Sequence, residues 1–161
     1  MEYCYICGEK LEDKYLEHEG IIPYCNKCKD YIFPIFSSAV SLIISDKEEK
    51  KFLLVKQYGK DFYRFVAGYI NKGESAEEAL ERELMEEVGL KAISYKPLKT
   101  SYFAKSNTLM INYLVHVENL NVVSNYEIDS YAWIDLDNVC ESLKDASLAL
   151  EFFEFYLNNR K

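Results

Sequence analysis

The segment GYINKGESAEEALERELMEEVGL, from Gly68 to Leu90, carries the most structural information in this chain. Ser75 followed by Glu78 is a capping box, in which the serine hydroxyl accepts from an early backbone N–H and the glutamate reaches back to the serine N–H. Residues 76–88 contain no proline or glycine, and Gly89 suits the left-handed position just past a helix. The sequence therefore predicts a helix over 76–88.

This helix has two different faces. An apolar stripe recurs at helical spacing and would anchor the helix to a core, namely Leu80, Leu84 and Val88. At about 100° per residue, three glutamates share another arc of about 100°, namely Glu83, Glu86 and Glu87. Like charges at i,i+4 destabilise a helix by a few tenths of a kcal/mol, so a cation is expected to offset them. Clustered carboxylates suit Mg²⁺ or Mn²⁺ shared with substrate phosphates, and the alternative is a solvated acidic helix face.

The spacing of the segment carries a family resemblance. Its skeleton is Gly68, five residues, Glu74, seven residues, Arg82-Glu83-Leu84, one residue, Glu86-Glu87, one residue and Gly89-Leu90. This pattern resembles the 23-residue box of the Nudix hydrolases, and every constrained position is present. Chance is a poor explanation for a match at all of these positions.

The resemblance implies an α/β (α+β) fold, in which a Nudix-type mixed β-sheet is sandwiched between helices. It also implies hydrolysis of a nucleoside diphosphate linked to another moiety by attack of water at phosphorus. Carried over by position, four residues would bind the catalytic Mg²⁺ or Mn²⁺, namely Gly68 through its carbonyl and Glu83, Glu86 and Glu87. Glu83 would also be a candidate base, and Arg82 and Glu74 would orient the glutamates. A homodimer is expected at the level of the family.

One further metal ligand is expected from outside the box. Many family members add a glutamate a few residues before a tryptophan late in the domain. Glu127 stands six residues before Trp133 and is the candidate here. The alternative is an ordinary loop carboxylate.

Four of the five cysteines form two CxxC pairs separated by 17 residues, namely Cys4, Cys7, Cys25 and Cys28. This is the spacing of a four-cysteine zinc site, and without an open position the Zn²⁺ would be structural. We read no signal peptide or membrane-spanning run in the sequence, so a reducing, cytoplasmic compartment is expected, which disfavours a disulfide alternative. Residues 1–34 are predicted to form a small N-terminal zinc ribbon that depends on metal for folding, and 35–161 the Nudix hydrolase domain.

The combination of a ribbon and a Nudix box, with Ala67-Gly68-Tyr69, resembles the NADH pyrophosphatase branch of the family. The signature of that branch downstream of the box is serine-glutamine-proline-tryptophan-proline-phenylalanine-proline, followed by leucine-methionine. The aligned residues 100–110 keep Leu109-Met110 but lack all three prolines and the tryptophan, so the loop is freer to be a strand. Hydrolysis of NADH, NAD, ADP-ribose or another dinucleotide therefore remains open.

Several side chains are candidates for substrate contact. Tyr102 and Phe103 would stack on a base, or else be core or interface residues. Arg64 and Lys105 would assist an anionic substrate, or else be solvated surface charges.

Composition limits the partners. The 19 basic and 27 acidic residues give a net charge of −8, and binding to a phosphate backbone demands a basic stripe. A small-molecule nucleotide is therefore the expected partner, with neither nucleic acid nor membrane. The alternatives are a non-catalytic, regulatory nucleotide-binding Nudix domain and a Nudix enzyme that removes RNA caps.

The coarse pattern of apolar residues predicts six strands and a last helix. The strands are predicted at 39–45, 51–57, 65–67, 101–105, 108–117 and 131–134, and the helix at 147–159.

Overall fold

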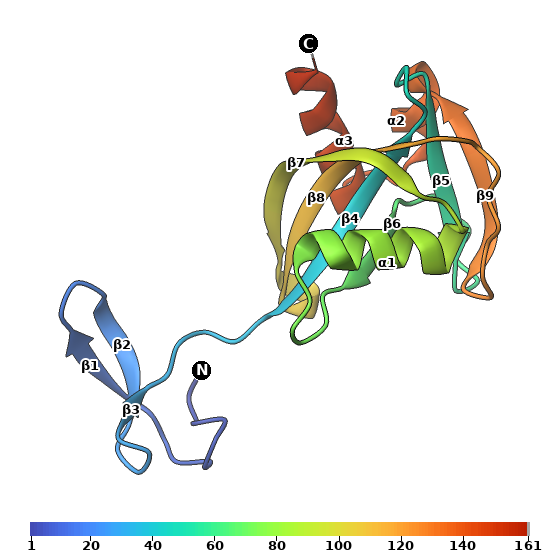
Figure 1. The fold of residues 1–161 in the computed structure, drawn as a ribbon. Coiled ribbons are helices and arrows are strands. Elements are labelled where there is room, and N and C mark those ends of the chain that lie inside the picture. The colour runs from blue at the N-terminus through green and yellow to red at the C-terminus, as the bar shows by residue number, and fades with distance from the viewer. Residues whose placement is uncertain (161) are drawn as a thin grey trace. The chain divides into compact units, whose positions relative to one another are not determined.

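The structure, a computed structural model, describes residues 1–160 and divides into two compact units (Figure 1). The first unit is Met1–Phe36, and the second begins at Ser37. The boundary lies two residues beyond the predicted one after Pro34. Among residues 1–160, no helix is long and apolar enough to cross a membrane.

The first unit is a small antiparallel sheet with strand order β1-β2-β3. Its strands are β1 (Glu12–Leu16), β2 (Gly20–Cys25) and β3 (Asp30–Tyr31). Its described buried core consists of Cys4, Cys25 and Ile32. So little apolar burial cannot offset the entropy of ordering the segment, which is why such modules need a metal or another cross-link.

The second unit is built on a six-stranded mixed sheet with order β7-β8-β4-β5-β9, and β6 pairs with β4 beside this path. β4 and β8 run parallel, and the other pairs are antiparallel. The strands are β4 (Ser37–Ser45), β5 (Lys51–Gln57), β6 (Val66–Tyr69), β7 (Ala92–Phe103), β8 (Thr108–Val117) and β9 (Ile128–Asp135). The helices are α1 (Ala76–Val88), α2 (Val139–Ser142) and α3 (Leu148–Asn159), with short 3-10 turns at Ala104–Ser106 and Leu136–Asn138.

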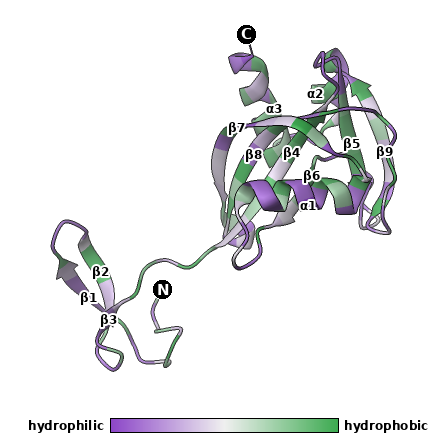
Figure 2. Cartoon of the chain, in the orientation of Figure 1, coloured by the Kyte–Doolittle hydropathy of each residue, from purple (hydrophilic) through white to green (hydrophobic). Residues whose placement is uncertain are grey.

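Helices cover both faces of this sheet. Successive strand residues point to opposite sides, so each face carries apolar side chains that a helix buries. Leu42 and Ile44 of β4 belong to the core under α1, whereas Ile43 between them belongs to the core with α2 and α3. Figure 2 shows the hydrophobic residues along the central strands and hydrophilic stretches on α1. The predicted mixed sheet between helices is confirmed.

The predicted helix over 76–88 is also confirmed. Ser75 accepts from the backbone N–H of Glu78, the Glu78 carboxylate accepts from the backbone N–H of Ser75, and Gly89 is left-handed with φ 66°. The apolar stripe of α1 is buried, as predicted, at Leu80, Leu84 and Val88.

One strand prediction is wrong. The segment predicted as a short strand over 101–105 is the end of the twelve-residue β7, and residues 104–106 form a 3-10 turn instead. Pro97 hides this strand in the sequence, since proline weakens a ladder. β7 tolerates it because it is an edge strand whose register slips between Pro97 and Lys99.

β4 pairs with two different strands along its length. Its residues 39–42 pair with β6, and Ser45 pairs with β5. α1 packs on β4 and β6. This arrangement places the glutamate face of α1 beside the end of β6.

Candidate functional site

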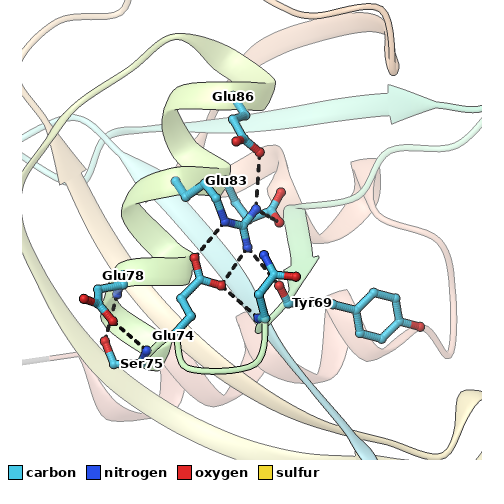
Figure 3. Close-up of polar contacts among 8 residues, drawn as sticks. Tyr69, Glu74, Ser75, Glu78, Glu83 and Glu86 are labelled. Atoms are coloured by element: carbon cyan, nitrogen blue, oxygen red, sulfur yellow. Dashed lines mark hydrogen bonds and ion pairs between the residues drawn. The ribbon is translucent and has the colours of Figure 1, made fainter.

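The guanidinium of Arg82 connects the acidic residues of the box. It donates to both carboxylate oxygens of Glu74 at 2.7 and 3.0 Å, to Glu83 at 2.6 Å and to Glu86 at 3.2 Å. It also donates to the backbone carbonyl of Tyr69 at 2.9 Å, which ties α1 to the end of β6. Figure 3 shows the three carboxylates converging on the guanidinium. The hydrogen bond to Arg82 lowers the pKa of Glu74 to about 2.

Gly68 has no side chain, and the carboxylate of Glu83 occupies the space that a side chain would fill. A Cβ atom at this position would lie 1.9 Å from both Cδ and Oε1 of Glu83, far inside van der Waals contact. The Glu83 carboxylate therefore rests directly against the backbone of β6, in the space that any larger side chain at position 68 would occupy. The same contact brings that carboxylate close to the backbone of Gly68.

Glu87 is the buried carboxylate of the cluster, with only 4% of its surface exposed. Gln57 donates to it at 2.8 Å. Burial, with the nearby charges of Glu83 and Glu127, raises the pKa of Glu87 to about 8. A carboxylate in such a position favours either a proton or a metal cation.

The segment that follows β8 carries Glu127 to this cluster. Its backbone passes the end of α1, where Val123 N–H donates to Val88 O at 2.9 Å and Asn125 N–H donates to Glu87 O at 3.1 Å. Glu127 then accepts from the Tyr58 hydroxyl at 2.5 Å, and this bond raises the pKa of Tyr58 to about 12.

These carboxylates lie in the wall of a cleft of about 970 Å³, at the upper end of typical ligand-pocket volumes. The lining includes most of the predicted site residues, namely Gly68, Arg82, Glu83, Glu86, Glu87, Glu127, Arg64, Phe103 and Lys105. Glu74 reaches the cleft only through Arg82. Tyr102 lies outside this lining, and its hydroxyl donates to Asn107 at 2.6 Å.

The cleft also holds side chains that sequence reasoning missed, namely Gln57, Tyr58, Phe62 and Lys144. None belongs to a recognisable motif. They reach the cleft because of strand pairing and chain reversal, so no local signal could have identified them.

The second candidate site is in the first unit, where the Sγ atoms of all four predicted cysteines lie within 4.8 Å of one another. The Cys7–Cys25 and Cys4–Cys28 separations are 3.5 and 3.9 Å. Two sulfurs bound to one tetrahedral ion at about 2.3 Å lie about 3.8 Å apart, so these separations suit a metal site. All four thiols are free.

The thiol cluster cannot ionise fully by itself. Hydrogen bonding to Cys7, with burial, raises the pKa of Cys28 to about 12. A bound cation would offset the charge of the thiolates and displace their protons.

Comparison with known proteins agrees with this geometry. The family model described as NUDIX domain matches residues 36–155. The NAD-capped RNA hydrolase NudC of Pseudomonas aeruginosa is 24% identical over 161 residues, which are 98% of this chain and 56% of that protein. Nudix hydrolase 19, chloroplastic, of Arabidopsis thaliana is 26% identical over 152 residues, 88% of this chain and 34% of that protein. The chain thus spans about half or less of the length of these curated relatives.

Solved structures show the same fold. A NUDIX hydrolase from Nitrosomonas europaea has a TM-score of 0.66 at 15% identity and covers 99% of this chain and 92% of its own. The NUDIX domain of Shewanella oneidensis NrtR, complexed with ADP ribose, has a TM-score of 0.65 at 18% identity and covers 84% and 92%.

Proposed function

The chain belongs to the Nudix family, and on that premise we propose that it is a metal-dependent pyrophosphohydrolase. It cleaves a nucleoside diphosphate linked to another moiety, of the NAD(H) or ADP-ribose type. The observation that carries the proposal is the carboxylate cluster in the wall of the cleft, where Glu87 is only 4% exposed beside Glu83 and Glu127. A domain that only binds nucleotides has no need for a cluster of carboxylates in its cleft.

The donor set fits Mg²⁺ or Mn²⁺, because hard divalent cations prefer oxygen ligands. The proposed ligands are Glu83, Glu86, Glu87, Glu127 and the Gly68 carbonyl. When bound, the cation supplies the charge that polarises the diphosphate and lowers the pKa of the attacking water.

The residues of the chain prepare this site. Arg82 fixes Glu83 and Glu86, and Glu74 in turn fixes Arg82 through a two-point contact. Glu83 is the proposed base, because its carboxylate lies at the β6 backbone and lines the cleft. Its proton acceptor is thereby held in one place before substrate arrives, which lowers the cost of orientation in the transition state.

NAD-capped RNA is a second candidate substrate. The similarity to the NAD-capped RNA hydrolase of Pseudomonas aeruginosa favours it. The net charge of −8 opposes contact with a long phosphate backbone, so we favour the free dinucleotide.

The test is hydrolysis by the purified protein with Mg²⁺ or Mn²⁺. The substrates are NADH, NAD, ADP-ribose, diadenosine polyphosphates, nucleoside triphosphates and a short NAD-capped RNA. Glu86→Gln is expected to lose most of the activity, whereas the matched control Glu81→Gln, an exposed glutamate of α1 outside the cleft, keeps it. Absence of turnover with every substrate, or full activity of Glu86→Gln, sinks the proposal.

For the first unit we propose a zinc ribbon, in which Zn²⁺ is held structurally by Cys4, Cys7, Cys25 and Cys28. The sulfur separations support this assignment. Metal analysis of carefully prepared protein is expected to give about one equivalent of zinc, and less than about half an equivalent overturns it.

We also propose that the protein is cytoplasmic and forms a homodimer. The free thiols support a reducing compartment. Sedimentation equilibrium tests the dimer, and a mass equal to one chain of 18.9 kDa at micromolar concentration contradicts it.

A further inference from the structure

The cleft contains more positive charge than its ion pairs use. Of its basic residues, Arg82 is fully engaged by carboxylates. Within residues 1–160, no carboxylate comes within ion-pair distance of Arg64, Lys105 or Lys144, which also line the cleft. Unpaired cations facing a cleft are available to an anionic ligand.

The backbone of Arg64 is fixed to the sheet. Its backbone forms two hydrogen bonds with Val55 of β5, at 2.9 and 3.0 Å, which fix the start of the side chain beside the sheet. Its Nε is enclosed, and no described residue offers it a hydrogen-bond acceptor. Leaving a buried donor unpaired costs about 1–3 kcal/mol, a cost that a ligand oxygen would remove.

Arg64 belongs to the same cleft as the carboxylate cluster. It lines that cleft together with Glu83 and Glu87. A diphosphate bound at the carboxylates through a cation would therefore lie in the same cleft as Arg64.

A second cation shares the same aromatic ring. The guanidinium carbon of Arg64 and the Nζ of Lys144 each lie 4.8 Å from the centre of the Phe62 ring. Cation–π attraction to Phe62 holds both charges at this wall. Asp145 also lines the cleft, so two positive charges, of Arg64 and Lys144, stand against one negative charge.

We propose that Arg64 and Lys144 form a phosphate subsite for the phosphate group that is not held by the cation at Glu83, Glu86 and Glu87. The two are positioning residues that select diphosphates over monophosphates and hold the leaving phosphate. This inference rests on the proposed function, which places the diphosphate at the carboxylates.

The test measures binding, so it needs no turnover. The non-hydrolysable probe α,β-methylene-ADP is titrated by calorimetry in the presence of Mn²⁺, and AMP is the one-phosphate comparison. We expect the parent protein to bind the diphosphate probe about tenfold or more tightly than AMP, in line with a charge-assisted contact. In Arg64→Gln/Lys144→Gln this advantage is expected to fall to about twofold or less.

Two controls separate phosphate binding from structural damage. Lys60→Gln removes the same charge from the same loop at an exposed position outside the cleft, and it is expected to keep the advantage. Mn²⁺ affinity in the absence of nucleotide should be unchanged or tighter in Arg64→Gln, because the proposed carboxylate ligands are kept and a positive charge that lines the same cleft is removed. A merely structural role of Arg64 would weaken Mn²⁺ binding as well.

The inference is overturned if the double variant keeps the preference for the diphosphate, if it weakens AMP equally, or if Mn²⁺ binding falls with it. Hydrolysis by the parent protein tests the proposed function separately. If the parent protein hydrolyses its substrate but the double variant keeps the preference for the diphosphate, only the subsite proposal is contradicted. If the parent protein prefers the diphosphate but hydrolyses no substrate, only the enzymatic proposal is contradicted.

Discussion

Replacing Gly68 by alanine should disable the proposed metal site while leaving the fold intact. The new Cβ would lie 1.9 Å from Cδ and Oε1 of Glu83. Carbon atoms in contact prefer about 3.5–4.0 Å, so the carboxylate must retreat by about 1.5–2 Å. Alanine itself causes no backbone strain here, because Gly68 is not among the residues with positive φ.

The expected magnitudes differ for folding and for function. The group that moves is the end of a flexible side chain, so the free energy of unfolding should change by less than about 1 kcal/mol. A misplacement of about 1 Å near the reacting groups can cost about 100-fold in rate. We therefore expect kcat/KM to fall by about 100-fold or more and Mn²⁺ affinity to fall by about tenfold.

Mn²⁺ titration, urea unfolding and hydrolysis rates measure these effects. Glu83→Asp provides a second check, because its side chain is one methylene shorter and withdraws the carboxylate from the added Cβ. In that background Gly68→Ala should cost much less than in the parent, since the two changes act on one contact. Parent-like Mn²⁺ affinity in a folded Gly68→Ala protein, or additive effects in the double variant, would refute the argument.

Three further changes have defined outcomes. Because the hydrogen bond from Arg82 lowers the pKa of Glu74 to about 2 from its ordinary 4.5, this contact stabilises the fold above about pH 4.5 and is lost as pH falls towards 2. Unfolding measured across that range should show a larger acid loss for the parent than for Glu74→Gln, and equal losses would contradict the contact. Cys25→Ser should unfold Met1–Phe36, as judged by limited proteolysis, while the second unit keeps its cooperative melting, because the proposed zinc would cross-link the small core of the first unit. Leu84→Ala, at a fully buried position of α1, should lower the free energy of unfolding by about 2–5 kcal/mol in urea titration, and a loss below about 1 kcal/mol would contradict the described packing.

The sequence by itself determined helix α1 and the cysteine cluster, because the signals for both lie within a few neighbouring residues. The capping box at Ser75, the glycine at 89 and the apolar stripe of α1 are each read within a few residues, so the predicted helix agrees with the structure. The two CxxC pairs likewise predicted a cluster, since each turn presents two thiols by itself. Most of β7 was missed for the converse reason, because the strand is defined by its pairing with β8 and Pro97 breaks its pattern.

Tertiary structure alone decided what surrounds the glutamates of α1. Glu127 reaches Glu87 because backbone hydrogen bonds from Val123 and Asn125 lead the chain past the end of α1. Arg64 and Lys144, 80 positions apart in the sequence, meet at one aromatic ring because strand pairing and the approach to α3 bring them there. The sequence by itself determined the reactive box, since its spacing follows one helix and its caps. The part of the cleft formed by Arg64 and Lys144 depends on contacts between distant segments, which form only once the sheet has formed.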